Sequence, residues 1–495
     1  MYLNNKFVPI IYNYKTKMEL YKKTDLELVA NNINKIVEDI ENIRKTLYPR
    51  DTDNDTDTEK KIPEKKIPDR NDVDKIVEIV LTFVKDKKRK IYGGFGLNAI
   101  IKNKNKDDAF YSDDEIPDID TYSPTPIEDL VELCDQLYNA GFTDVFGTEA
   151  FHEGTYKIFT KGYNAIDLSY VPKMIYDNIP FVEIDNVRYT SPYFVTIDFY
   201  RILSEPLFSS WRWEKVFKRL YLLQKYYPFK KVPNDNKFLS KVYVHKANNQ
   251  NAIDIIENFI IDNEEIYLFG DFAYNILVDK SITKDFEKVN IGIYQIISTN
   301  YKKDANNLIK KLKNSGLNVS YKEYYPFWTF TGYSVEILID GEVIVKMYNH
   351  LKRCCPVSKV QYENTKSGFV QIGSFDFLLL MEMVLMFREK VKRDENKKKY
   401  HEMMLSNLII MREHYLKKNK LTLLDDSLFQ SFKMSCVGKA IDPIAEARKQ
   451  RKEKKEHKTT GFNYKPIREI KTKWVFSNTS GNEINNPKNL KLNKK

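Results

Sequence analysis

Three aspartates in the first third of the chain have the type and spacing needed to hold divalent cations. Asp118 and Asp120 stand two apart in a β-prone segment, and because side chains alternate between the faces of a strand, both carboxylates are expected on one face. Asp167 is a lone acid between apolar neighbours in a later β-prone segment, 164–170. If the two strands are neighbours, the three carboxylates can hold two divalent ions about 4 Å apart for phosphoryl transfer. An isolated Asp-x-Asp is more often a solvated strand edge or loop, so the prediction depends on its surroundings.

A glycine pair upstream supplies part of those surroundings. Gly93 and Gly94 follow a short predicted strand, 91–92, and precede a predicted helix that continues through 97–101. Without Cβ atoms, the backbone amides of such a turn can approach a phosphate, and a helix N-terminus adds partial positive charge. No Gly-Lys-Ser/Thr follows, so this is not a Walker motif. Asn98 can either brace the turn or contact a nucleotide sugar, and a plain tight turn is the alternative.

Basic and aromatic residues interleave at 211–219. On a helix, Arg212, Lys215 and Arg219 share one face and are candidate ligands of a triphosphate or of RNA phosphates. The alternative is an amphipathic helix whose basic face is only solvated. A denser basic run, 448–458, begins a polar tail, which predicts salt-dependent affinity for nucleic acid or, alternatively, a solvated tail.

Length and composition exclude several classes of protein. The chain has 495 residues and a net charge of +11, which allows roughly two to four domains and favours a polyanionic partner. Its four cysteines show no CxxC or zinc-finger spacing, so we expect neither a disulfide framework nor a structural zinc site, and a reducing setting. The first residues lack a signal-peptide pattern, and the most apolar stretch, 375–387, carries Asp376 and Glu382, which argues against a membrane span.

The glycine segment recurs later in the chain, which indicates a duplicated domain. Residues 91–100 can be laid over 267–277, with Gly270 under Gly93. Further matches follow in the same order: 139–142 with 314–317, 162–163 with 332–333, and 191–194 with 374–377. Coincidence among Tyr- and Asn-rich segments is the alternative.

The same alignment predicts that the second copy has lost the acids. It places Asn290 and Gly292 under Asp118 and Asp120, and Ile337 under Asp167, with Glu336 one residue out of phase. A strand residue that is one out of phase faces the opposite side of the sheet. The second copy is therefore expected to fold without binding metal and to serve RNA binding or dimerisation.

The predicted fold class is α+β, with four parts along the chain. Apolar residues at a 3-4 spacing over 26–47 predict a helix that packs on its own domain or forms a dimer seam. The predicted parts are a helical N-terminal region with an acidic, proline-containing linker (1–70), a catalytic domain (71–235), a degenerate copy of it (236–445) and a basic tail (446–495).

The order of these motifs resembles the polymerase-β-type nucleotidyltransferase superfamily. More narrowly, the segments 93–98, 118–120, and 191–194 through 211–215 resemble the catalytic poly(A) polymerases of large DNA viruses, in particular the mimivirus and megavirus relatives of the poxvirus enzyme. One departure is the 24 positions from Gly94 to Asp118, a long acidic insertion with further carboxylates such as Asp113 and Asp114. The strand-like flanks favour Asp118 and Asp120 over these.

The resemblance implies a template-independent adenylyltransferase that extends an RNA 3′ end from ATP with two Mg²⁺ or Mn²⁺ ions. Asp118, Asp120 and Asp167 would bind the metals. Gly93 and Gly94 would hold the nucleotide phosphates, and nucleotide contacts of Asn98, Arg212 and Lys215 are candidates from the residues themselves. A homodimer, no membrane association, and a place in the virion and the host cytoplasm are expected. The alternatives are another terminal transferase, of the 2′-5′ oligoadenylate or CCA-adding type, and a non-catalytic RNA-binding scaffold.

Overall fold

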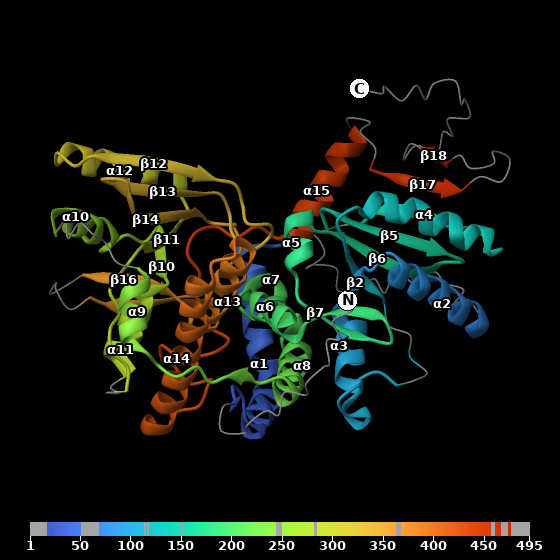
Figure 1. Ribbon diagram of the computed structural model, residues 1–495, viewed down its shortest axis with the longest axis horizontal. Coiled ribbons are helices and arrows are strands. Elements are labelled where there is room, and N and C mark those ends of the chain that lie inside the picture. Colours follow the sequence, from blue (N-terminus) through green and yellow to red (C-terminus); the bar gives the residue numbers. More distant parts are fainter. Residues whose placement is uncertain are drawn as a thin grey trace, which may run out of the picture. The chain divides into compact units, whose positions relative to one another are not determined.

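The computed structural model of the chain (Figure 1) describes residues 17–50, 69–112, 115, 118–150, 152–243, 250–281, 285–362, 368–456, 461–466 and 474–476. The chain forms two compact units. The first unit comprises 43–196 and 441–495, and the second comprises 1–42 and 197–440. Two helices cross these limits, α1 (Lys23–Leu47) and α6 (Pro192–Leu203).

The first unit is built on a sheet with the strand order β18-β17-β4-β5-β6-β3-β2-β8-β7. The strands are β2 (Lys90–Tyr92), β3 (Asp120–Ser123), β4 (Phe146–Glu149), β5 (Thr155–Thr160), β6 (Tyr163–Tyr170), β7 (Phe181–Ile184), β8 (Val187–Thr190), β17 (Asn463–Pro466) and β18 (Trp474–Phe476). The helices are α2 (Arg70–Asp86), α3 (Gly93–Lys102), η3 (Lys106–Asp108), α4 (Pro126–Asn139), α5 (Lys173–Asn178) and α15 (Pro443–Glu456).

Helix α2 shows why this part of the chain folds as it does. Val73, Ile76, Val80 and Val84 recur at helical spacing, and all four are buried. Asp69 caps the helix by accepting a hydrogen bond from the backbone N–H of Asn71.

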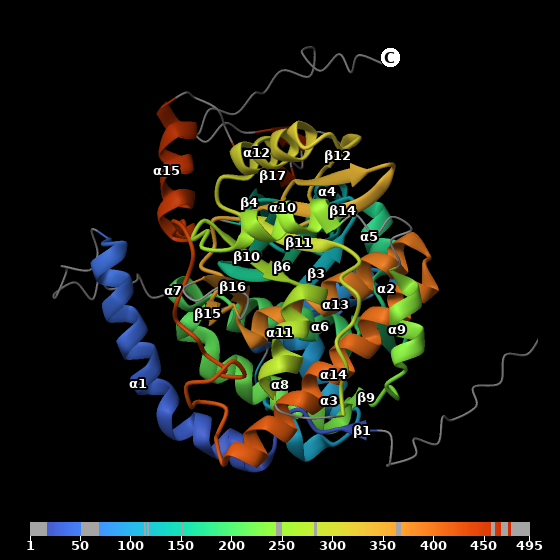
Figure 2. The same ribbon diagram turned by 90° about the vertical axis from the view of Figure 1, so that its left-hand side faces the viewer.

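The second unit contains a seven-stranded sheet with the order β12-β13-β14-β11-β10-β16-β15. These strands are β10 (Ile266–Phe269), β11 (Tyr294–Ser298), β12 (Val319–Tyr324), β13 (Ser334–Ile339), β14 (Glu342–Asn349), β15 (Val357–Gln361) and β16 (Phe369–Gly373). A separate strand pair is formed by β1 (Lys17–Met18) and β9 (Phe229–Lys230). The helices wholly within this unit are α7 (Pro206–Ser209), η4 (Ser210–Arg212), α8 (Trp213–Tyr226), α9 (Asn236–Val242), α10 (Gln250–Ile260), α11 (Asp271–Ser281), α12 (Tyr301–Asn314), α13 (Phe375–Lys392) and α14 (Glu395–Asn419). Figure 2 shows α13 and α14 side by side, as an antiparallel pair joined by a turn at Arg393.

The two sheets confirm the predicted duplication. The order β4-β5-β6-β3-β2-β8-β7 of the first sheet is repeated as β12-β13-β14-β11-β10-β16-β15 in the second, and every neighbouring pair runs in the same relative direction. A side-chain detail also recurs. Ser123 donates a hydrogen bond to Asp129 on α4 at 2.5 Å, and Ser298 donates to Asp304 on α12 at 2.6 Å.

Part of the predicted basic tail, 446–495, contributes strands to the first sheet. Strand β17 pairs with β4 at the edge of the first sheet, and Tyr464 on this strand is buried and donates a hydrogen bond to Asp135 on α4 at 2.5 Å. The compact units therefore differ from the predicted ranges, because the chain returns to the first sheet after residue 440. Sequence inspection missed this because β17 is short and lies among polar residues.

Two other expectations can be compared with the structure. The predicted helix over 26–47 is present as α1, and its Val29, Ile33 and Ile40 are buried within the chain. Where the sequence analysis expected no disulfide framework, the structure has one disulfide, between Cys354 and Cys436, whose Cα atoms are 5.3 Å apart. The two cysteines are 82 residues apart and belong to no sequence motif that would predict their pairing. An isolated antiparallel β-bridge between Pro356 and Cys436 brings the two segments together. None of the helices that the structure describes is both long and apolar enough to span a membrane.

Candidate active site

The glycine turn between β2 and α3 lies directly against an aspartate. Gly93 has a φ of +70°, a backbone conformation that L side chains rarely adopt. A Cβ at this position would overlap the Oδ2 atom of Asp120, and a Cβ at Gly94 would overlap the hydroxyl of Tyr111. The turn therefore needs glycine at Gly93 for conformation and space, whereas a Cβ at Gly94 would require the end of the Tyr111 side chain to move.

Strand register brings Asp120 and Asp167 together. In the antiparallel pair β2–β3, Tyr92 is opposite Asp120, and in the parallel pair β3–β6, Asp120 is opposite Asp167. Residues in register on neighbouring strands point to the same face of a sheet. The two carboxylates therefore lie side by side, on the face opposite to α4, because Ser123 points the other way to bond α4.

Asp118 is less closely integrated than predicted. It is exposed and precedes β3, which begins at Asp120, so it is not itself part of a strand. Burial and then the charge of Asp118 raise the pKa of Tyr163, the first residue of β6, to about 12. Among the described residues, no group of three or more His, Cys, Asp or Glu side chains is gathered as a metal site. The structure thus brings together two of the three predicted ligands.

A lysine that the sequence analysis missed holds Asp167. Lys157 on β5 is opposite Asp167, and its Nζ lies 2.9 Å from Oδ1 and 2.6 Å from Oδ2 of that carboxylate. The Nδ2 of Asn164 donates a further hydrogen bond to Oδ1 at 2.8 Å. One cation therefore balances part of the charge of neighbouring carboxylates. The sequence shows Lys157 only as a lysine in a β-prone segment, and it does not show that Asp167 is the residue opposite.

Asn98 braces the acidic insertion. Its Oδ1 accepts hydrogen bonds from the backbone N–H groups of Phe110 at 2.9 Å and Tyr111 at 3.2 Å, which holds Tyr111 near Gly94. Asn275, its counterpart in the second copy, braces a loop in the same way through two 2.8 Å hydrogen bonds with Val289. Asn98 thus braces the insertion and not the glycine turn itself, and sugar binding stays a prediction. Asp113 and Asp114 lie outside the described residues.

Arg212 and Lys215 belong to the second unit. Both side chains are exposed, and the guanidinium of Arg212 lies 5.5 Å from the ring centroid of Trp211, which is itself 73% exposed. Their contact with a nucleotide or with RNA stays a prediction.

In the second copy, the residues that correspond to Asp118, Asp120 and Asp167 are not the ones that the sequence alignment predicted. In β10–β11, Phe269 is opposite Gln295, as Tyr92 is opposite Asp120, so Gln295 and not Gly292 replaces Asp120. In β11–β14, Gln295 is opposite Lys346, so Lys346 and not Ile337 replaces Asp167. Two residues before Gln295, Ile293 replaces Asp118 in place of the predicted Asn290.

The error has a structural cause. The hairpin turn of β5–β6, with positive φ at Lys161 and Gly162, corresponds to the turn of β13–β14, with positive φ at Asp340 and Gly341. The sequence alignment had instead matched Gly162 with Gly332, which shifted the second half of the repeat. The expectation that this copy lacks counterparts of Asp118, Asp120 and Asp167 is unaffected by the correction.

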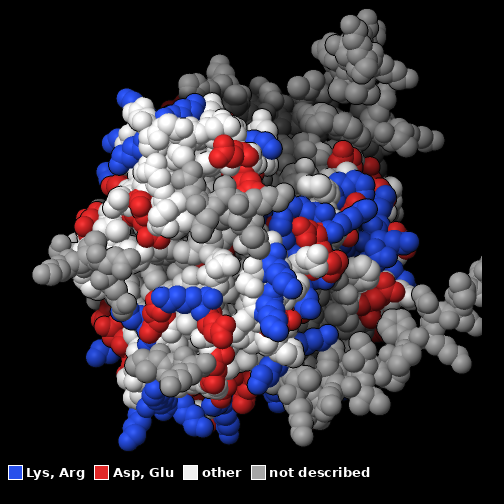
Figure 3. Space-filling model, turned by 60° about the vertical axis from the view of Figure 1, so that its left-hand side comes forward, with Lys and Arg blue, Asp and Glu red and all other residues white. Residues whose placement is uncertain are grey.

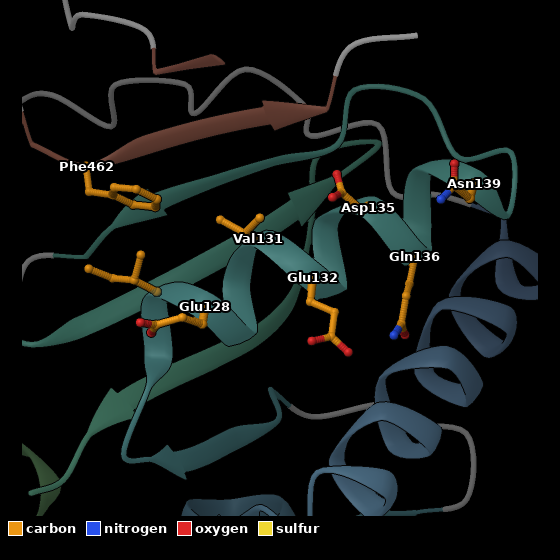
Figure 4. Close-up of a pocket in the computed structure, with 8 residues that line it drawn as sticks. Glu128, Val131, Glu132, Asp135, Gln136, Asn139 and Phe462 are labelled. Atoms are coloured by element: carbon orange, nitrogen blue, oxygen red, sulfur yellow. The ribbon is translucent and has the colours of Figure 1, made fainter. Parts of the chain in front are cut away.

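A hollow elsewhere in the first unit is not part of this site. It has a volume of about 570 Å³, lies on the outer surface of α4, and is lined by Ile127, Glu128, Val131, Glu132, Asp135, Gln136, Asn139 and Phe462 (Figure 4). Because α4 covers the face opposite to Asp120 and Asp167, this hollow lies behind the sheet and away from the carboxylates.

Comparisons with known proteins identify the family. Residues 78–209 match the family model described as "Poly(A) polymerase catalytic subunit". Residues 222–494, more than half of the chain, match the model described as "APMV, Putative poly(A) polymerase, catalytic subunit, C-terminal". The chain belongs to this family of poly(A) polymerase catalytic subunits. The enzyme class expected from the sequence, a poly(A) polymerase, is thereby confirmed.

Individual poly(A) polymerase relatives support the same assignment. A putative poly(A) polymerase catalytic subunit of Acanthamoeba polyphaga mimivirus is 33% identical over 458 residues, which cover 84% of this chain and 78% of that protein. A protein of the same description from African swine fever virus (isolate Pig/Kenya/KEN-50/1950) is 27% identical over 302 residues, 59% of this chain and 58% of that protein. The crystal structure of the Megavirus polyadenylate synthase superposes with a TM-score of 0.72 at 30% identity, covering 99% of this chain and 96% of that one.

Proposed function

We propose that this poly(A) polymerase adds adenylate from ATP to RNA 3′ ends without a template, with Asp118, Asp120 and Asp167 as ligands of two Mg²⁺ or Mn²⁺ ions. The observation that carries the proposal is the register that places Asp120 beside Asp167 and over Gly93. Carboxylate oxygens are the ligands that these hard cations prefer, so the residues fit such ions. When bound, the ions would stabilise charge on the attacking and leaving oxygens.

The chain's own groups have distinct tasks in this proposal. The turn at Gly93 and Gly94 offers backbone N–H groups at the N-terminus of α3, where a triphosphate is favoured by both hydrogen bonding and partial positive charge. Lys157 and Asn164 fix the orientation of the Asp167 carboxylate. Asn98 keeps the insertion in place so that the Tyr111 hydroxyl lies at the edge of the turn. Arg212 and Lys215 remain proposed contacts for triphosphate or RNA.

We further propose that the chain forms a homodimer and contacts RNA through basic surface patches. The exposed end of α1, with Ile43 at 38% and Leu47 at 60% exposure, is the part of the predicted seam that can serve a homodimer. On the face shown in Figure 3, Lys and Arg side chains gather in patches among acidic and neutral residues, which suits contact with RNA. We also propose action in the virion and the host cytoplasm, which the viral origin of the relatives supports.

The substrate can be tested with each nucleotide in turn. We expect a 5′-labelled RNA primer, incubated with Mg²⁺ or Mn²⁺ and one nucleoside triphosphate, to be extended by many residues with ATP and poorly with CTP, GTP or UTP. Sizing the products on a gel measures this directly, and omission of the metal is the control. Addition of a fixed short CCA sequence, or a product resistant to a 3′-5′-specific nuclease, would instead indicate one of the other terminal transferases. No incorporation of any nucleotide would indicate the scaffold.

A further inference from the structure

The second copy carries the ion pair of the first copy with its charges exchanged. Where Lys157 on β5 faces Asp167 on β6, Glu336 on β13 faces Lys346 on β14, and the Nζ of Lys346 lies 2.8 Å from Oε1 of Glu336. The neighbouring Gln295 takes the place of Asp120. A centre of two acids and one lysine has thus become a centre of one acid and one lysine, which no longer attracts cations.

Further cations gather on this face from α13. This helix has 18 residues, against 12 in its counterpart α6, and its last turns carry Arg388 and Lys392. Arg388 donates a hydrogen bond to the hydroxyl of Tyr348 at 3.0 Å. Burial and then the charges of Arg388 and Lys346 lower the pKa of Lys392, and Glu389 opposes this shift. Glu389 pairs with Lys392 at 3.5 Å but compensates only part of this charge.

The edge strand β12 adds an exposed lysine and tyrosine to the same face. Lys322 is opposite Glu336, and Tyr324 donates a hydrogen bond to Oε2 of Glu336 at 2.7 Å. The Tyr324 ring is 40% exposed and lies 4.7 Å from the Nζ of Lys346. Beneath them, the Oε1 of Gln295 is buried and has no hydrogen-bond partner among the described residues, so a polar atom remains unsatisfied in this centre.

We propose that this face of the second copy, formed by the exposed Lys322, Tyr324 and Lys392 above the buried Lys346, binds single-stranded RNA through its phosphate backbone and without a metal ion. The inference rests on the proposed function, which supplies RNA as the polyanion. Lysines give salt-dependent contacts to phosphates, and an exposed aromatic ring offers a base a surface for stacking. The exchanged ion pair explains why the face needs no divalent ion, because Lys346 supplies positive charge where the first copy presents Asp167.

The test measures RNA affinity of the full-length protein in EDTA. Fluorescence anisotropy of a labelled oligo(A) is titrated at several salt concentrations for wild type, for the double variant Lys322→Gln with Lys392→Gln, and for Tyr324→Ser. We expect about tenfold weaker binding by the double variant and a salt slope smaller by about 1 per lysine removed. Lys322 and Lys392 are exposed or largely exposed, so both variants should fold. Tyr324→Ser should weaken binding with little change of the slope.

Matched controls lie on the other face of the same sheet. Lys303→Gln with Lys310→Gln removes two exposed lysines from α12, and Tyr321→Ser removes an exposed tyrosine from the opposite side of β12. Affinity and slope that match these controls would overturn the inference. The inference would also be overturned if the variants of this face changed the sedimentation coefficient of the protein but not its RNA affinity. That result would make the face a protein interface. Asp120→Ala should keep its RNA affinity in EDTA, so a failure of the proposed catalysis is distinguishable from a failure of this inference.

Discussion

Replacing Asp120 with alanine is expected to lower the rate of adenylate addition by more than about 10³-fold, because metal stabilisation of the transition state is worth several kcal/mol. Asp167→Ala should have a comparable effect, since the two carboxylates lie in register on β3 and β6. The folded state of Asp120→Ala should persist, because removing one of two neighbouring carboxylates relieves their repulsion, whereas Asp167→Ala also removes the ion pair with Lys157 and should lose some stability. Single-turnover primer extension measures the rate, and circular dichroism checks the fold.

The matched control removes acids from the insertion. Asp113→Ala combined with Asp114→Ala should keep most of the activity, because these acids lack the strand-like flanks of Asp118 and Asp120. Near-wild-type turnover in both Asp120→Ala and Asp167→Ala would show that the carboxylates do not hold the reacting centre.

Gly93→Ala is expected to reduce activity by about 100-fold, since small displacements of a catalytic group can cost this much. The new methyl group would overlap the Asp120 carboxylate and displace it from its position beside Asp167. The φ of +70° adds a conformational cost of about 1 to 2 kcal/mol for a residue with a Cβ. Primer extension and the free energy of unfolding in urea separate the two effects.

Gly141→Ala is the control for the conformational cost alone. Gly141 also has a positive φ, +94°, but a Cβ there would meet no atom within 4 Å. We expect a similar loss of stability with little loss of activity. If Gly93→Ala were as active as Gly141→Ala, the close approach of Gly93 to Asp120 would have no catalytic importance.

Local sequence signals were enough to predict the parts of the site that depend on one segment. The strand–glycine–helix unit at 90–102 has its own signature in the Gly93-Gly94 pair. The helical spacing over 26–47 likewise depends only on neighbouring residues. The duplication was detectable because both copies kept the glycine turn and the ends of α4 and α12.

What could not be predicted depends on pairing between distant segments. Lys157 meets Asp167 only through the register of β5 and β6, and that register is set by the turn at Lys161 and Gly162. The same lack of register information led to the wrong counterparts in the second copy, where Ile337, nine residues before Lys346, was matched with Asp167. Strand β17 reaches the sheet from the far end of the chain, about 300 residues from β4.

The central claim is that the chain holds one metal-dependent centre, in the first copy. Electron paramagnetic resonance of free Mn²⁺ in the presence of a non-hydrolysable ATP analogue counts the ions bound per chain. We predict two ions for the wild type and none of comparable affinity for the double variant Asp120→Ala with Asp167→Ala. Retention of one or both tightly bound ions by the double variant would contradict the claim and place a metal site outside Asp120 and Asp167.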